Sequence, residues 1–427
     1  IGIGGIGMSG LAQIMNNIGF TIQGSDLNRN KNIDRLIKKG IKVFIGHHKK
    51  NLSKTTMVVI SSAIKKNNME LITARHKKLP VFKRGEMLAN IVALKKNIVI
   101  TGSHGKTTTT SLVANILVEA GLDPTVINGG VINSLKNNAQ LGKGEWAVIE
   151  SDESDGSFLK LPITYSIVTN LDKEHLDYYG SFKKLKKSFI NFIEKTPSFG
   201  KSLICIDNNY LKSLLTKCKT RNFFTYGFNK HANYQIKNVR KNKNFSIFDL
   251  KLKFPSSRTT TIRNIVVNLI GEHNITNATA SIAIALNLGI KVNKIKKALK
   301  KFLGIQRRFT KVFSLGKREF YDDYAHHPTE IKAVINSARQ VYKNRKIICV
   351  FQPHRYSRIN SLKNEFALSF KSSDAVVLCP VYSAGEKKMY NFNQDNFSKL
   401  ISKKSKIQVI NIKNQKELKN YFKKNLL

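Results

Sequence analysis

Short apolar runs separated by segments of helical periodicity recur along most of the chain. The runs at residues 58–60, 98–100, 146–149 and 347–351 each end in small or polar residues. Runs bounded in this way are typical of buried parallel strands, whose carboxyl ends carry the ligand sites of α/β sheets. Residues 234–268 differ, because alternating apolar residues there predict a β meander. The pattern as a whole predicts an α/β fold with several modules.

A strand–turn–helix segment around residue 102 has the features of a phosphate-binding loop. The apolar strand 98–100 leads to Gly102 and Gly105, which allow backbone N–H groups to approach an anion closely. The start of the helix that follows favours negative charge. Lys106 can neutralise terminal phosphates, and the hydroxyl of Thr107 can hold Mg²⁺.

The spacing of this loop departs from the ordinary pattern. Only Ser103 and His104 separate the first glycine from the Gly-Lys pair, where the common phosphate loop has four residues. The alternative interpretation is a capped helix after a strand. That alternative explains the threonines at 107–110 poorly, because β-branched residues are not favoured at a helix start.

Acidic residues cluster in an otherwise very basic chain. The formal net charge is +46, yet the segment from Glu145 to Asp177 holds eight of the 27 acidic residues. Glu150 directly ends a strand, like the metal-holding acid of nucleotide hydrolases, and His175 can supply an imidazole to a second divalent ion. Each acid alone could be a helix cap or a solvated loop residue. Two clusters after two strands, downstream of a phosphate loop, indicate a cation site.

The two ends of the chain add further ligand signals. Gly4, Gly5 and Gly7 followed by Asp26 after the next strand resemble a dinucleotide-fold fingerprint, although any tight α/β turn gives the same pattern. In the last module the strands end in loops rich in Arg and His, which suit an anionic substrate or a transferring phosphoryl group.

A predicted helix in the middle of the chain carries two more candidate residues. Asn274 and Asn277 share one face of this helix and could bind the edge of a base, or they could merely cap and pack.

Seven motifs, in this order and spacing, resemble the Mur ligase family. They are TGSHGKTTTT, ESDESDGSFL, NLDKEHLDYYG, GEHNITNA, QRRF, DDYAHHPTEI and FQPHRYSR. The short phosphate loop is the family's own form, with Ser103 where Thr is usual. The resemblance implies a Rossmann-like UDP-sugar-binding domain at 1–95, a central P-loop ATP-binding domain at 96–303 and a Rossmann-like C-terminal ligase domain at 304–427.

The resemblance also implies a reaction. ATP phosphorylates the lactyl carboxylate of UDP-N-acetylmuramate, and an amine attacks the acyl phosphate to give an amide, ADP and phosphate. The segment 153–158 looks more like the family member that adds L-alanine than like the member that attaches a recycled tripeptide, which remains the alternative. The expected setting is the cytoplasmic synthesis of peptidoglycan precursors, with ATP and Mg²⁺ as cofactors.

Matching motifs imply the role of each site residue. Catalysis is expected from Lys106, His175, His326, Arg355 and Arg358. Mg²⁺ is expected at Thr107, Glu150 and His175. ATP is expected to contact Gly102, Ser103, His104, Gly105, Lys106, Thr107, Thr108, His273, Asn274, Asn277, Arg308 and Asp323. The UDP moiety is expected at Gly4, Gly5, Gly7, Ser25 and Asp26, and alanine with the reacting carboxylate at Tyr324, His326, Arg355 and Arg358.

Composition leaves two other function classes to consider. The charge of +46 would suit a nucleic-acid-binding NTPase, but the lysines are spread along the chain and no tail or finger concentrates them. An NAD-dependent oxidoreductase would rest on the opening glycines and Asp26 alone and leaves the loop at 102–108 unexplained. We therefore expect no nucleic-acid partner.

Several general properties follow from the sequence. The four cysteines are scattered without a CxxC pair, so reduced thiols and a cytoplasmic location are expected. No run approaches the ~20 apolar residues of a membrane helix, so no membrane partner is expected. We expect a monomer or weak homodimer. The chain begins within a strand at Ile1 and lacks the family's usual final Gly-rich segment, so we expect a partial chain.

Overall fold

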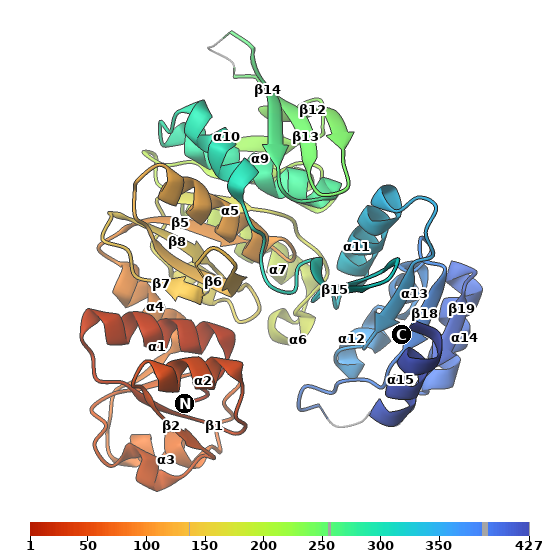
Figure 1. The fold of residues 1–427 in the computed structure, drawn as a ribbon. Coiled ribbons are helices and arrows are strands. Elements are labelled where there is room, and N and C mark those ends of the chain that lie inside the picture. The colour runs from red at the N-terminus through yellow and green to blue at the C-terminus, as the bar shows by residue number, and fades with distance from the viewer. Residues whose placement is uncertain (136, 255–257, 387–391, 427) are drawn as a thin grey trace. The chain divides into compact units, whose positions relative to one another are not determined.

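The chain forms two compact units of α/β structure. The computed structural model describes residues 1–135, 137–254, 258–386 and 392–426 (Figure 1). The first unit comprises Ile1–Arg240, Ile247–Asn268 and Asn274–Ile305, and the second comprises Lys241–Ser246, Leu269–His273 and Gln306–Leu427. The predicted α/β class is confirmed. The predicted boundaries at 95/96 and 303/304 stay predictions.

The N-terminal part of the first unit contains two small parallel strand pairs with their helices. Its elements are α1 (Ile6–Ile18), β1 (Gln23–Asp26), α2 (Lys31–Lys38), β2 (Lys42–Ile45), β3 (Val58–Ile60), α3 (Met69–His76), β4 (Val81–Lys83) and α4 (Arg84–Val92). β1 pairs with β2 and β3 pairs with β4. The predicted Gly-rich turn is confirmed, since α1 begins directly after Gly5.

A ten-stranded sheet forms the centre of the first unit. Its strands, in spatial order, are β14 (Thr260–Val267), β13 (Ser246–Leu252), β12 (Tyr234–Lys241), β11 (Phe223–Gly227), β10 (Ser202–Cys205), β9 (Tyr165–Val168), β5 (Lys96–Thr101), β8 (Trp146–Glu150), β6 (Thr125–Ile132) and β7 (Asn137–Gln140). The predicted meander corresponds to β12–β14. The helices of this part are α5 (Lys106–Glu119), α6 (Leu176–Tyr179), α7 (Phe182–Glu194), α8 (Asn209–Leu215), α9 (Glu272–Asn287) and α10 (Val292–Lys301).

The register of three parallel strands brings the predicted ligand loops to one sheet edge. Ile100 of β5 lies beside Glu150 of β8 and Ile167 of β9. The middle residues of these strands are buried, and Ile98, Val148 and Ile167 are solvent-inaccessible. The polar loops that follow β5, β8 and β9 therefore emerge side by side.

The second unit combines a hairpin with a three-stranded parallel sheet. The antiparallel hairpin consists of β15 (Thr310–Leu315) and β16 (Arg318–Asp322), and the sheet has the order β17 (Ile348–Phe351), β18 (Ala375–Leu378), β19 (Gln408–Asn411). Its helices are α11 (Pro328–Val341), α12 (Tyr356–Ser361), α13 (Lys363–Leu368), α14 (Gln394–Ser405) and α15 (Gln415–Tyr421). Its core contains Phe351, Phe366, Phe370 and Phe397. Pro328 begins α11, as predicted.

The helices of the described segments are too short or too polar to cross a lipid bilayer.

Candidate functional site

The loop after β5 is a tight turn whose two glycines have no room for a side chain. Gly102 and Gly105 have φ angles of +131° and +80°. A Cβ on Gly102 would lie 2.2 Å from Thr169 Oγ1, and one on Gly105 would lie 2.7 Å from Asn277 Oδ1. α5 begins with Lys106, and no described side chain caps its N-terminus. The first-turn N–H groups of α5 are therefore available to an anion.

Ser103 and His104 fix the loop to the segment that follows β9. His104 N donates to Asn170 Oδ1 at 2.7 Å, and Asp172 N donates to Ser103 Oγ at 2.8 Å. His104 Nε2 lies 2.8 Å from Asp172 Oδ2. The two residues were predicted as ATP contacts, and the structure places their side chains in the scaffold of the loop.

Replacing Gly102 by alanine should reduce the unfolding free energy in two ways, through steric overlap with neighbouring atoms and through backbone strain, and a control variant separates them. Gly102→Ala is expected to lose about 1–3 kcal/mol of unfolding free energy from overpacking and about 1 kcal/mol or more from its left-handed backbone. The control is Gly121→Ala, because Gly121 has a φ of +83° and nothing within 4 Å of its Cβ position. Urea unfolding measures both. Equal losses in the two variants would contradict the close packing of the loop.

Lys106 lies in a buried ion pair that sequence reasoning missed. Its Nζ is 2.9 Å from Glu153 Oε2 and donates to the Gly102 carbonyl at 2.6 Å. The Glu153 side chain is 1% exposed. Burial alone would lower the pKa of Lys106, but attraction by Glu153, Asp152 and Glu150 outweighs it and raises that pKa. Lys106 is therefore held as a cation at the mouth of the loop.

Thr107 and Glu150 provide adjacent oxygen atoms. Thr107 Oγ1 donates to Glu150 Oε1 at 3.1 Å, and Gly129 N donates to Glu150 Oε2 at 2.6 Å. Neighbouring ligands around Mg²⁺ at about 2.1 Å are separated by about 3 Å. Carboxylate and hydroxyl oxygens are the donors that Mg²⁺ prefers. The predicted pair therefore fits one Mg²⁺ ion.

His175 belongs to a second group of donors around Glu153. Its Nε2 lies 3.4 Å from Glu153 Oε1. The ligand atoms of Asp152, Glu153 and His175 all lie within 4.8 Å of one another. Burial would lower the pKa of His175, but its hydrogen bond to Glu153 and the nearby acids raise it. This group fits a divalent cation separate from the Thr107–Glu150 pair.

The predicted adenine contacts are neighbours in the sequence but belong to both compact units, with His273 in the second and Asn274 and Asn277 in the first. Asn277 approaches the phosphate loop through Gly105, and its Nδ2 is 3.4 Å from Asn274 Oδ1. His273, in the second unit, is buried, and burial together with Arg308 lowers its pKa to about 4. His273 is therefore uncharged near neutral pH.

Asp323 and Arg308 lie together in the second unit. Asp323 accepts hydrogen bonds from Phe309 N and Ala325 N, each at 2.7 Å. Burial raises the pKa of Asp323 to about 6, although Arg308 opposes the shift. Much of the hydrogen-bonding capacity of this carboxylate is used within the chain.

The Arg- and His-rich edge of the second unit gathers most of the predicted amino-acid contacts. His326 Nδ1 is 2.9 Å from the Tyr324 carbonyl. A carbonyl only accepts, so Nδ1 carries a proton and Nε2 of the neutral ring is an acceptor. Arg358 Nη1 lies 3.4 Å from Nδ1 of His354. Arg355, at the start of α12, donates its backbone N–H to the Tyr382 carbonyl at 2.8 Å.

His354 is a member of this edge that sequence reasoning missed. Its ring centroid is 5.7 Å from that of His326 and 5.2 Å from that of Tyr382. Burial, together with the neighbouring His326 and Arg358, lowers the pKa of His354 to about 4. The sequence feature that could have identified His354 was its position beside Arg355 in the motif FQPHRYSR.

The Gly-rich turn at the N-terminus is braced by Asp26. Gly4 N donates to Asp26 Oδ2 at 2.8 Å, and Asn32 Nδ2 donates to the Gly4 carbonyl at 2.8 Å. Gly5 is the N-cap of α1, and no described side chain caps that helix. The first turn of α1, which includes Gly7, can therefore receive an anion.

Ser25 is turned into the N-terminal part and not toward solvent. It is 3% exposed. Its Oγ donates to Glu70 Oε2 at 2.5 Å, and Asn51 Nδ2 donates to Glu70 Oε1 at 2.6 Å. His47 Nδ1 lies 3.0 Å from the same carboxylate. The prediction that Ser25 faces UDP stays a prediction, and its hydroxyl proton is donated to Glu70, a residue that sequence reasoning missed.

Family models cover nearly the whole chain. The Mur ligase family catalytic domain matches residues 1–96, the Mur ligase middle domain matches 100–285, and the Mur ligase glutamate ligase domain matches 307–424. These three matches follow the order of the three predicted domains.

Similar proteins and structures agree with the family models. A UDP-N-acetylmuramate–L-alanine ligase of Pelagibacter ubique is 57% identical over 423 residues, which are 99% of this chain and 91% of that protein. The Rhizobium etli ligase of the same name is 49% identical over 387 residues, 90% of this chain and 82% of that protein.

Two solved structures share the fold. The UDP-N-acetylmuramate-alanine ligase of Thermotoga maritima has a TM-score of 0.82 at 28% identity, covering 98% of this chain and 91% of that one. A murein peptide ligase of Psychrobacter arcticus has a TM-score of 0.73 at 22% identity, covering 100% and 92%. The chain belongs to the Mur ligase family.

Proposed function

We propose that this chain joins L-alanine to the lactyl carboxylate of UDP-N-acetylmuramate, with conversion of ATP to ADP and phosphate. The observation that supports this most is the phosphate loop, where Lys106 is held by Glu153 and Thr107 by Glu150. The relatives at 57% and 49% identity carry the name of this activity. A cytoplasmic location and the oligomeric state stay predictions.

The loop supplies the groups that phosphoryl transfer needs. A carboxylate oxygen of the substrate attacks the γ-phosphorus of ATP, and the bond from that phosphorus to ADP breaks. Lys106 and the α5 N–H groups stabilise the negative charge that spreads over the transferring oxygens. Mg²⁺ held by Thr107 and Glu150 would supply further charge neutralisation. These fixed groups act in a largely buried site, where they are more effective than in water.

The second unit supplies the groups that amide formation needs. The alanine nitrogen attacks the acyl carbon, and the carbon–oxygen bond to phosphate then breaks. Arg355 and Arg358 suit the carboxylate of alanine, because guanidinium groups bind carboxylates in a bidentate manner. His326 keeps Nε2 as an acceptor, so it can take a proton from the attacking amine.

Replacing the metal-binding carboxylate should raise the Mg²⁺ requirement. In Glu150→Gln we expect at least about a tenfold rise in the Mg²⁺ concentration for half-maximal ATP binding, because one anionic ligand is lost. Calorimetric titration of ATP at several Mg²⁺ concentrations measures this without turnover. Glu145→Gln is the control, since Glu145 pairs with Lys96 on the surface. An unchanged Mg²⁺ requirement in Glu150→Gln would contradict the assignment.

Product mass tests the proposed substrates. With ATP, Mg²⁺ and UDP-N-acetylmuramate, the product made with L-alanine should have the mass of the alanyl amide. A product formed with the recycled tripeptide and not with alanine would contradict the proposal and favour the alternative member of the family.

A further inference from the structure

Asn170, which follows β9, holds the backbone of the phosphate loop with its side chain. Its Oδ1 accepts the His104 N–H at 2.7 Å, and its Nδ2 donates to the His104 carbonyl at 2.9 Å. One side-chain amide therefore pairs with both backbone groups of one loop residue, as two paired residues of a β ladder do. Asn170 opens the motif NLDKEHLDYYG but was not among the predicted site residues.

This contact continues the pairing of β5 with β9 beyond the ends of the two strands. Thr169 N donates to the Thr101 carbonyl at 3.0 Å, and Ser103 N donates to the Asn170 carbonyl at 3.3 Å. At His104 the side chain of Asn170 takes the place of the next strand residue, because its amide offers the same donor and acceptor as a peptide group. The ladder therefore extends into the phosphate loop.

Thr169 restricts the same part of the loop. Its Oγ1 donates to the His104 carbonyl at 2.6 Å, which is the carbonyl that Asn170 also contacts. A Cβ on Gly102 would lie 2.9 Å from the Asn170 carbonyl oxygen. The segment after β9 thus packs against the loop at its first glycine and at His104, so the loop has little room to rearrange.

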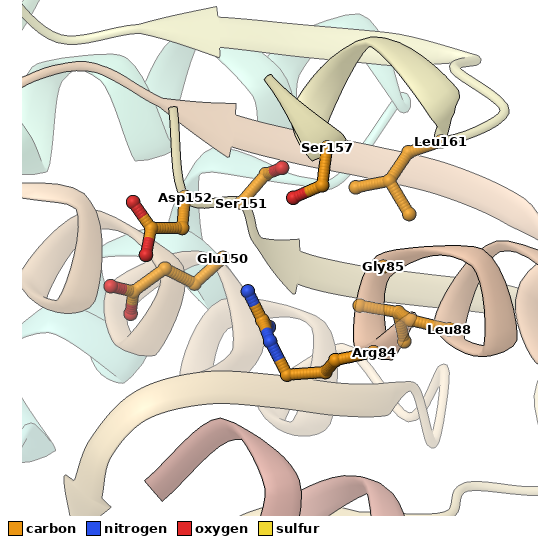
Figure 2. A pocket seen from close by; sticks show the side chains of 8 residues that line it. All are labelled: Arg84, Gly85, Leu88, Glu150, Ser151, Asp152, Ser157 and Leu161. Atoms are coloured by element: carbon orange, nitrogen blue, oxygen red, sulfur yellow. The ribbon is translucent and has the colours of Figure 1, made fainter. Parts of the chain in front are cut away.

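The loop after β8, on the other side of β5, contacts different elements. Figure 2 shows the side chains of Glu150 and Arg84 in the small pocket that they help to line. Glu150 accepts hydrogen bonds from Thr107 Oγ1 at 3.1 Å and from Gly129 N at 2.6 Å. The β8 side therefore contacts α5 and β6, and the β9 side holds the backbone of the phosphate loop.

These bonds decide which N–H groups remain for the phosphates of ATP. The N–H groups of Ser103 and His104 are used by Asn170. The first-turn N–H groups of α5 have no acceptor within the helix, and no described side chain caps them. Phosphates can bind to these groups and to Lys106 without any rearrangement of the loop. A preformed site of this kind avoids the entropic cost of ordering the loop on binding.

We propose that Asn170 is a positioning residue of the ATP site and holds the loop in its phosphate-binding shape before ATP arrives. This assignment rests on the proposed function. The phosphates are then bound by the first turn of α5 and by Lys106, while the N–H groups of Ser103 and His104 stay paired with Asn170. Asn170 acts through the loop and takes no part in phosphoryl transfer.

Binding of ADP to Asn170→Leu tests the proposal, because leucine has a similar volume and makes neither hydrogen bond. We expect the dissociation constant of ADP to rise about 10-fold, since the loop then has its binding shape for only a fraction of the time. The Michaelis constant for ATP should rise similarly, while kcat at saturating ATP falls by less than about threefold. UDP-N-acetylmuramate affinity should stay unchanged. Asn170→Ala, which adds no bulk, serves if the leucine variant fails to fold.

Asn233→Leu is the matched control. Asn233 Oδ1 accepts from Thr225 N at 2.9 Å, and its Nδ2 donates to the Lys253 carbonyl at 2.9 Å. This variant loses the same kinds of bond in the β meander, so it should lower the unfolding free energy similarly and leave ADP affinity unchanged. An equal loss of ADP affinity in the two variants would overturn the assignment, as would an unchanged ADP affinity in Asn170→Leu.

Hydrogen exchange tests whether the loop is formed before the nucleotide binds. In the wild-type chain without nucleotide, the amides of Ser103 and His104 should be protected, and Asn170→Leu should speed their exchange by at least about tenfold. ADP should protect the first-turn amides of α5 and leave those two amides unchanged. Rapid exchange of both amides in the nucleotide-free wild type would overturn the proposal. A wild-type chain that binds no ADP would instead contradict the proposed function.

Discussion

Replacing Lys106 by methionine is expected to lower turnover by at least about 10³-fold. The variant keeps most of the side-chain length but loses the cation that we propose to stabilise the transferring phosphoryl group. The affinity for UDP-N-acetylmuramate should stay within about twofold, because we propose that it binds in the N-terminal part, whereas the phosphate loop follows β5. Coupled ADP release measures turnover, and calorimetry measures affinity.

Lys183→Met is the matched control for this variant. Lys183 is an exposed residue of α7, so the same substitution there should leave turnover unchanged. Sugar-nucleotide affinity that fell together with turnover in Lys106→Met would contradict the separation of the two sites.

Neutralising Glu153 should destabilise the chain strongly. In Glu153→Gln the Lys106 ammonium loses its partner while it stays buried, and breaking a buried pair in this way costs about 3–5 kcal/mol. Urea unfolding at neutral pH measures the loss. The double variant Lys106→Met/Glu153→Gln should lose less than the sum of the single losses, because no unpaired charge remains. Additive losses would contradict a direct pair.

The same pair predicts a pH dependence. Burial would raise the pKa of Glu153, but Lys106 and His175 outweigh it and lower that pKa. A carboxyl group whose folded pKa is lowered stabilises the fold above its unfolded pKa of about 4.3 and loses this contribution as the pH falls through the folded pKa. The stability difference between wild type and Glu153→Gln should therefore shrink below about pH 4. A constant difference at low pH would contradict the charge pairing.

Residues could be predicted to lie together from the sequence where a suitable residue type stands directly at the end of a strand. Glu150 ends β8 and Thr107 begins α5, and parallel pairing of β5 with β8 brings them to 3.1 Å. Strand ends meet at one edge of a parallel sheet whatever the details of packing. The fold class and this half of the site could therefore be predicted from apolar periodicity and loop chemistry.

The surroundings of the other site residues depend on which side chains are buried, and burial depends on contacts between segments that are distant in the sequence. Glu153 and Asp155 belong to the same acidic cluster, yet Glu153 is buried against Lys106. Ser25 looks like a ligand residue at a strand end but donates to Glu70, which is 45 positions away. No local pattern distinguishes such residues, because their partners come from other helices and loops.

Isotope transfer tests the central claim, activation of the lactyl carboxylate by ATP, most directly. UDP-N-acetylmuramate labelled with ¹⁸O in its lactyl carboxylate is incubated with ATP, Mg²⁺ and L-alanine. An acyl phosphate passes one carboxylate oxygen to the phosphate that is released, so the account predicts phosphate carrying one ¹⁸O atom for each amide formed. Amide formation with unlabelled phosphate would contradict it.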